Sequence, residues 1–293
     1  MNRRSRGQSP AFPGPLRVGG RAGTSGPWPS PQKQHSKLQN MAQVSVIVIA
    51  LNQEDNIVPC LETVRWADDI VVVDSGSVDR TLELARGFTD RIFTIDWPGF
   101  GAAKNYALDQ ARGDWVFSLD TDERVSLALR DEIIAVLQGE SRFAGYRLPR
   151  KNYFGGRWIR RLGWYPDYTL RLFRRDKGRF RERTVHEEVV VHGSVGLLQN
   201  PLDHFSYASV SDYLARQDRY ARLAAQEMLK EGRRPQAGEL FWRPASHFLK
   251  LYFLRLGFLE GRLGYTLALL GSLYNFLKYY YLRELPHGAD HVH

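Results

Sequence analysis

The sequence predicts an α/β protein with a mainly parallel sheet, followed by a helical C-terminal region. Short β-branched segments alternate with helix-like segments between residues 44 and 120, which is typical of parallel strands covered by helices. Acidic residues stand where the apolar segments end, and an aromatic, basic tail closes the chain. We therefore expect three regions, which are a leader at 1–40, an α/β domain at 41–205 and a helical region at 206–293.

The first two strands are marked by uninterrupted apolar runs. Residues 44–50 are largely β-branched and contain no turn former, which predicts a strand buried on both faces. Residues 57–66 are expected to form a helix, with Pro59 accepted in its first turn. Residues 70–73 form the second buried strand, which ends at Asp74.

The following elements continue the alternation. Ser77 or Asp79 is expected to cap the next helix, and Gly113 is expected to end the one after it. No G-x-G-x-x-G follows the first strand, which argues against a dinucleotide-binding fold. The third strand is expected at residues 91–95, the helix after it at 100–112 and the fourth strand at 115–119.

The second half of the chain has a different pattern. Residues 145–198 mix short apolar segments with Gly, Pro, Trp and Arg, which predicts irregular strands and loops. Residues 209–230 carry apolar side chains at helical spacing and predict an amphipathic helix that Gly232 stops. Residues 240–285 are aromatic and basic. Their longest charge-free stretch, 263–277, has 15 residues, fewer than the roughly 20 needed to span a bilayer.

The tail therefore has two interpretations. Its Tyr, Trp, Lys and Arg residues fit a helix lying at a membrane surface. A helical hairpin packed on the α/β domain, or a dimer interface, is the alternative.

Composition narrows the function classes. A net charge of +9 and a pI near 9.7 favour an anionic partner such as nucleic acid, anionic lipid or a phosphorylated substrate. The single cysteine, Cys60, excludes an internal disulfide and a cysteine-based zinc cluster. Residues 1–40 are rich in Arg, Gly, Pro and Ser and have too few aliphatic residues to form a core. They contain no apolar stretch of the kind that a secretory signal needs. We expect translation to start at Met41, so that this leader would not be native; a transit peptide is the alternative interpretation of the leader.

Asp120 and Asp122 follow the fourth strand directly. Ligands of open α/β sheets bind beyond the carboxyl ends of the strands, and a pair of carboxylates there suits Mg²⁺ that also contacts substrate phosphates. Solvated loop acids are the alternative.

Four segments that contain these acids resemble glycosyltransferase family 2, whose members are inverting, nucleotide-sugar-dependent enzymes with the GT-A fold. The segments are residues 44–57, 71–81, 104–107 and 113–123. Later segments resemble the lipopolysaccharide core glucosyltransferase branch of that family. They are residues 163–167, 171–174, 185–187, 257–264 and 278–279.

The resemblance implies a UDP-hexose donor, with glucose favoured, and the inner core of lipopolysaccharide as acceptor. A polyprenyl phosphate or another surface glycan is the alternative acceptor. The region at 41–205 would be the catalytic domain, and the protein would be peripheral on the cytoplasmic face of the inner membrane. A basic nucleic-acid-binding protein is a remote alternative, because the charges are scattered and no nucleic-acid module is visible.

The resemblance also assigns residues to the donor. Asp122 would be the principal ligand of Mg²⁺ or Mn²⁺, with Asp120 beside it or contacting the ribose. Asp74 would bind the uracil, unless it only forms a turn. Lys104 would contact the nucleotide, unless it is an exposed helix lysine. Asn52 and Glu54 would flank the nucleoside.

An inverting transfer needs a base for the acceptor hydroxyl. By resemblance this is Glu187, with His186 orienting it or contacting phosphate, and Asp167 is the second candidate. A salt bridge for Glu187 and a structural role for His186 are the alternatives. Arg171, Arg174 and Arg175 are interpreted as a basic cluster that binds a phosphorylated acceptor or as a solvated face.

Overall fold

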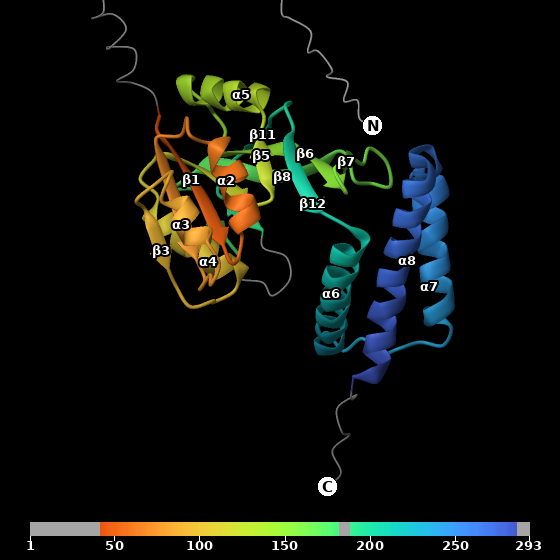
Figure 1. Cartoon of the computed structure of the whole chain (residues 1–293). Coiled ribbons are helices and arrows are strands. Elements are labelled where there is room, and N and C mark those ends of the chain that lie inside the picture. Colours follow the sequence, from red (N-terminus) through yellow and green to blue (C-terminus); the bar gives the residue numbers. More distant parts are fainter. Residues whose placement is uncertain (1–41, 182–187, 286–293) are drawn as a thin grey trace, which may run out of the picture. The chain divides into compact units, whose positions relative to one another are not determined.

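A computed structural model of the chain describes residues 42–181 and 188–285 (Figure 1). Its central element is one mixed sheet. Within this part the sheet has ten strands in the order β3-β2-β1-β4-β8-β6-β12-β5, with β7 and β11 attached to β6. A separate two-stranded sheet joins β9 and β10. The strands are β1 Val44–Ala50, β2 Asp69–Asp74, β3 Ile92–Thr94, β4 Trp115–Asp120, β5 Glu123–Val125, β6 Gly145–Phe154, β7 Arg157–Trp158, β8 Asp167–Arg174, β9 Gly178–Phe180, β10 Val189–Val191, β11 Val195–Leu197 and β12 Leu202–Tyr207.

The first four strands are parallel, as predicted. β1 lies between β2 and β4, and β3 pairs with β2. The register places Ala50 opposite Asp74 and Ile49 opposite Asp120, so the strand-end acids share one edge of the sheet. The predicted α/β class is confirmed.

Helices cover both faces of the sheet. Val46 and Val48 of β1 belong to the core beneath α2 and α5, whereas Ile47 belongs to the core beneath α4. This alternation follows from the two-residue period of a strand. The helices are α2 Glu54–Glu62, α3 Thr81–Ala85, α4 Phe100–Gln110, α5 Leu127–Gln138, α6 Val210–Lys230, α7 Glu239–Leu249 and α8 Gly261–Glu284.

The predicted bounds of two helices were wrong. α2 begins at Glu54, so Pro59 lies beyond the first turn. Its start is fixed by a distant loop, because Asp79 accepts the Glu54 N–H at 3.1 Å and Thr81 accepts that of Gln53. α4 ends before Gly113 is reached. Gly113 instead allows close approach of β1, since a Cβ there would lie 2.7 Å from the Ser45 nitrogen.

The segment predicted to be irregular contains long strands. β6 has ten residues and pairs antiparallel with β8, which also pairs antiparallel with β4. Leu148 and Leu172 are fully buried in the main core. Burial between neighbouring strands thus overrides the Pro and Arg residues that weaken the local strand pattern.

The C-terminal helices form a hairpin that packs on α6. α6 confirms the predicted amphipathic helix, and Ser209 caps it, because its Oγ accepts the Asp212 N–H at 3.1 Å. Figure 1 shows α7 and α8 side by side, joined by the π-helical turn η1 (Lys250–Leu254) and the 3₁₀ turn η2 (Gly257–Glu260). Leu267 of α8 packs in one cluster with Phe154 of β6. In the ranges that the structure describes, no helix has the length and apolar character needed to cross a membrane.

Candidate active site

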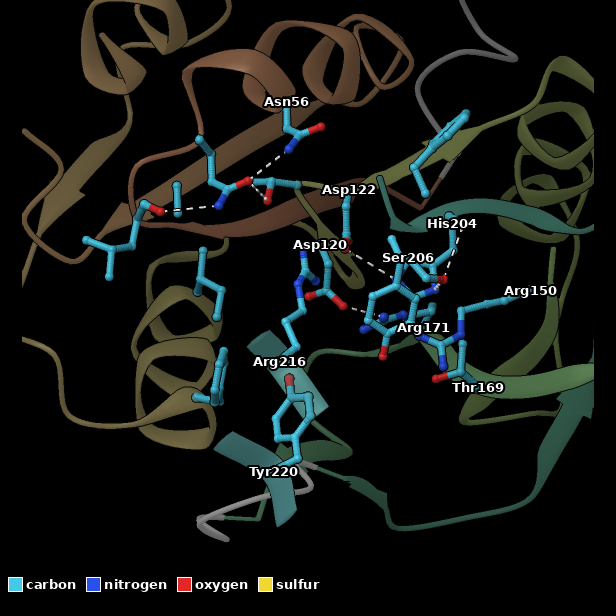
Figure 2. A pocket seen from close by; sticks show the side chains of 18 of the residues that line it. Asn56, Asp120, Asp122, Arg150, Thr169, Arg171, His204, Ser206, Arg216 and Tyr220 are labelled. Atoms are coloured by element: carbon cyan, nitrogen blue, oxygen red, sulfur yellow. Dashed lines mark hydrogen bonds and ion pairs between the residues drawn. The ribbon is translucent and has the colours of Figure 1, made fainter. Parts of the chain in front are cut away.

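A cleft of about 1660 Å³ opens at the carboxyl ends of β1 and β4. The turn at residues 120–122 lines one part of it, and α6 lines another. Figure 2 shows Asp120, Asp122 and His204 at this cleft, with Arg216 and Tyr220 of α6 reaching into the same space. The cleft therefore joins the predicted donor site to the C-terminal helices.

Asp122 faces a histidine that the sequence did not single out. Its Oδ2 lies 3.4 Å from Nε2 of His204 in β12. β12 pairs antiparallel with β5, and in this pairing His204 lies opposite Glu123. The pairing places the His204 ring beside the turn after β4. An isolated histidine in a half-buried strand gives no sequence signal for this role, so His204 was missed.

Asn152 determines the tautomer of His204. The Asn152 amide nitrogen donates to the Trp164 carbonyl at 2.8 Å, so its oxygen faces His204 Nδ1 at 2.7 Å. Nδ1 must then carry the ring proton. Nε2 is the ring nitrogen that faces Asp122, which is the arrangement of histidines that bind metals through one nitrogen and are held by the other.

This donor pair fits a divalent ion that also binds phosphate. Mg²⁺ sites of this type use one or two carboxylates and complete their shell with phosphate and water oxygens, whereas an imidazole nitrogen suits softer divalent ions. Among the described residues no group of three or more His, Cys, Asp and Glu side chains could hold a metal by itself. Asp122 and His204 therefore fit an ion that is bound together with a diphosphate.

Asp120 lies in a buried charge network. Its Oδ1 contacts Lys104 Nζ at 2.8 Å, and its Oδ2 contacts Arg171 Nη2 at 2.5 Å. The same Arg171 nitrogen lies 2.6 Å from Oε1 of the buried Glu123. Burial opposes ionisation of Asp120, but the charges of Arg171 and Lys104 outweigh it and hold its pKa well below the usual range. The network fixes the start of the turn that carries Asp122.

Lys104 is a buried part of this network. Its side chain is only 2% exposed, so the alternative of an exposed helix lysine was wrong. A direct contact with the nucleotide stays a prediction.

The other residues predicted for the donor support the loops after β1 and β2. Asp74 is buried and accepts the Gly76 and Ser77 N–H groups, both at 2.9 Å. Asn52 accepts the Val78 N–H, and Glu54 accepts that of Arg80. Asp74 thus has the bonds of a turn-forming residue. None of the three predicted donor residues lines the cleft, and their nucleotide contacts stay predictions.

Of the three residues predicted to act as the base or to orient it, the structure describes only Asp167. His186 and Glu187 lie outside the described residues. Asp167 Oδ2 accepts Nη2 and Nε of Arg150 at 2.6 and 3.0 Å, and Asn152 lies 3.3 Å away. This oxygen of Asp167 already accepts from three N–H donors, two of Arg150 and one of Asn152.

The predicted basic cluster at residues 171–175 does not exist. Arg171 is buried in the Asp120 network, whereas Arg174 packs 4.8 Å over the ring of Trp115 and Arg175 donates to the Gly113 carbonyl. β8 runs antiparallel to β4, so each step from residue 171 to 175 leads away from Asp120 toward the other end of the sheet. The acceptor phosphate site assigned to these three residues was therefore wrong.

Cys60 is expected to resist alkylation in the native protein. It is fully buried, and its Sγ donates to the Asp120 carbonyl at 3.5 Å. Burial raises the pKa of the thiol far above its usual range, so the reactive thiolate is scarce at neutral pH. Mass spectrometry after iodoacetamide treatment should show modification only in denaturant. Rapid modification without denaturant would contradict this burial.

Comparisons with known proteins agree with the motifs. The sequence profile described as "Glycosyl transferase family 2" matches residues 45–203, more than half of the chain. The lipopolysaccharide core biosynthesis glycosyltransferase LpsC of Rhizobium meliloti (strain 1021) is 32% identical over 246 residues, 80% of this chain and 89% of LpsC. An uncharacterized glycosyltransferase of Rickettsia typhi is 26% identical over 268 residues, which cover 86% and 90% of the two chains.

One of the solved structures to which the chain is similar is that of S. aureus TarS 1-349. Its TM-score is 0.41 at 16% identity, with 84% of this chain and 92% of that chain covered. The profile match and the identity to LpsC do not depend on this likeness. The chain therefore belongs to glycosyl transferase family 2, for which the resemblance implied the GT-A fold.

Proposed function

We propose that the protein transfers a hexose, with glucose favoured, from a UDP-sugar to the inner core of lipopolysaccharide, with inversion at the anomeric carbon. The carboxylate–imidazole pair of Asp122 and His204 at the cleft is the observation that carries the donor assignment. The identity to LpsC, whose name places it in lipopolysaccharide core biosynthesis, supports the acceptor assignment.

In this proposal Asp122 and His204 hold Mg²⁺ or Mn²⁺. When bound, such an ion neutralises the charge that develops on the UDP leaving group. Asn152 keeps the lone pair of His204 Nε2 available, and the Asp120 network keeps the turn in place. The protein thus holds both ligands in position before the donor binds.

The α6 side of the cleft suits an anionic, sugar-bearing acceptor. Arg216 and Arg219 line it together with Tyr220, and Arg147 and Tyr168 line it from the sheet. Arginine forks bind phosphate, and aromatic rings pack against sugar faces. A polyprenyl phosphate would use the same chemistry and is the second candidate acceptor.

Glu187 is proposed as the base, with His186 beside it, and Asp167 is the second candidate. We expect Glu187→Gln to lower the transfer rate by about 10²–10⁴-fold. Asp167→Asn should have a smaller effect, because one Asp167 oxygen is already held by Arg150. The check is the rate of transfer under donor saturation. Retention of transfer in Glu187→Gln and its loss in Asp167→Asn would reassign the base to Asp167.

The decisive experiment incubates the full chain with a panel of UDP-sugars, Mg²⁺ or Mn²⁺, and truncated lipopolysaccharide acceptors. Transfer from one UDP-hexose to an inner-core acceptor is the expected result. Transfer only to polyprenyl phosphate would favour the second acceptor. Salt-sensitive retention on DNA without turnover of any UDP-sugar would contradict the proposal. The proposed function includes a peripheral location of the protein on the cytoplasmic face of the inner membrane.

A further inference from the structure

The turn between α7 and α8 exposes several large apolar side chains. We call residues 249–262 the hairpin turn. Leu254 is 78% exposed and Leu259 is 56% exposed. The exposed apolar side chains of the hairpin turn are Leu249, Phe253, Leu254, Leu256, Phe258 and Leu259. Six large apolar side chains exposed within 11 residues of one turn, which we call the apolar edge, are typical of an interaction surface rather than of single exposed residues scattered over a protein.

The hairpin turn is firmly attached to the rest of the protein. The Arg255 carbonyl accepts the Leu162 N–H at 3.0 Å. Glu260 is buried and accepts the Arg160 N–H at 2.9 Å and Arg157 Nη2 at 3.0 Å. Its apolar side chains are therefore exposed on an ordered element, not on a segment that would fold inward after a small movement.

Arginine side chains surround this apolar edge. A cavity of about 470 Å³ beside Leu259 is lined by Arg157, Arg160 and Arg161 together with Trp158. The guanidinium of Arg160 lies 4.4 Å from the centre of the Trp158 ring. Further exposed cations of the hairpin turn are Lys250, Arg255 and Arg262.

These charges are only slightly compensated. Glu260 lines the same cavity, but its two oxygens already accept from Arg157 and from the Arg160 backbone. Within residues 42–181 and 188–285, Arg161, Arg255 and Arg262 form no ion pair with an acidic side chain. The cavity and its rim therefore present a net positive charge next to exposed apolar groups.

We infer that the hairpin turn docks on a membrane that contains anionic phospholipid. Its apolar side chains would enter the boundary between headgroups and acyl chains, and the arginine-lined cavity would take a lipid phosphate. This deepens the proposed function, because an enzyme whose acceptor is a lipid-linked glycan meets that acceptor at such a surface.

The charges favour a membrane over a second copy of the chain. A symmetric dimer places the same patch of both subunits against itself. Such a contact would bring two sets of arginines together, and like charges at an interface oppose association. A bilayer offers apolar depth and anionic phosphate at once, as this surface requires.

The test is flotation of the full chain with lipid vesicles. Vesicles of phosphatidylcholine alone are compared with vesicles of phosphatidylcholine mixed with phosphatidylglycerol, at low and high salt. We expect binding only to the anionic vesicles, with weaker binding at high salt. Leu254→Ser should weaken binding at least about tenfold. Arg161→Ala should weaken it about fivefold.

Matched controls lie on other exposed elements. Leu127, at the start of α5, is 70% exposed, and Arg86 is exposed after α3. Leu127→Ser and Arg86→Ala should bind vesicles as the unchanged protein does. Equal losses in these controls, or equal binding to neutral vesicles, would overturn the inference. So would a dimer that sedimentation velocity detects and Leu254→Ser dissociates while vesicle binding is unaffected.

The assay also separates this inference from the proposed function. Hydrolysis of UDP-sugar without acceptor needs no membrane, so Leu254→Ser should keep the rate of the unchanged protein. Vesicle binding without turnover of any UDP-sugar would contradict the proposed function and leave the docking inference standing. Turnover of a UDP-sugar without vesicle binding would contradict the docking inference and leave the proposed function standing.

Discussion

Replacing Asp122 with Asn is expected to lower the rate of sugar transfer at least about a thousandfold, equivalent to about 4 kcal/mol of activation free energy. The substitution keeps the shape of the side chain but removes the carboxylate 3.4 Å from His204 Nε2. A divalent ion that also binds the UDP diphosphate would then lose its anionic protein ligand. Single-turnover transfer from UDP-sugar is the measurement.

The fold should survive this change. The side chain of Asp122 is 22% exposed at the cleft, so the thermal unfolding midpoint should stay within a few degrees of the original. Asp176→Asn is a matched control, because Asp176 is 71% exposed in its side chain. A thousandfold loss in the control, or normal transfer by Asp122→Asn, would remove Asp122 from the site.

His204 should act together with Asp122. His204→Ala is expected to cause a loss of similar size, and the double variant should be little worse than either single one, since both side chains serve the same ion. Titration of Mn²⁺ in the presence of UDP gives an independent readout. Additive losses in the double variant would show that the two residues work separately.

The largest effect on stability is expected from Asp120→Asn, at roughly 3–5 kcal/mol of unfolding free energy. Lys104 and Arg171 have side chains that are only 2% and 7% exposed, and each contacts a different oxygen of Asp120. Without the carboxylate, these buried charges lose a large part of their compensation. Urea unfolding of both proteins at neutral pH measures the difference.

This difference should depend on pH in a defined direction. The folded-state pKa of Asp120 is depressed, whereas the pKa of an unfolded Asp is about 3.9. The stabilisation is therefore fully present above about pH 5 and is lost as pH falls below about 4 toward the folded-state pKa. The gap between Asp120→Asn and the unchanged protein should stay constant from neutral pH to about pH 5 and shrink below it.

The exposed pair of Asp109 and Arg179 provides the control. Both side chains are more than half exposed, so Asp109→Asn should cost at most about 1 kcal/mol. Equal costs for Asp109→Asn and Asp120→Asn would mean that the buried network adds no special stability.

Much of the fold could be predicted because its signals are local. The β-branched runs of β1 and β2 and the apolar run of β4 define buried strands by their own sequence. Parallel pairing then places Asp74 and Asp120 at one edge, since the carboxyl ends of parallel strands coincide. The α6 helix was predictable for the same reason, because its apolar period lies within one segment.

Other features depend on contacts between distant segments. β6 and β8 are regular because they pair with each other and with β4, which no local pattern shows. The start of α2 is fixed by Asp79, 25 residues away along the chain. The sequence could not distinguish a hairpin of α7 and α8 from a lone interfacial helix, because the difference depends on packing of these helices against α6.

The sequence by itself determined the α/β class, the family and the position of Asp122 at a strand end, because these depend on short-range periodicity and on motifs within single segments. Only the tertiary structure decided which side chains share the site. Pairing of β12 with β5 brings His204 to Asp122, and the antiparallel direction of β8 separates Arg171 from Arg174 and Arg175. Side-chain proximity depends on strand register, which is set by packing across the whole sheet rather than by neighbours in the sequence.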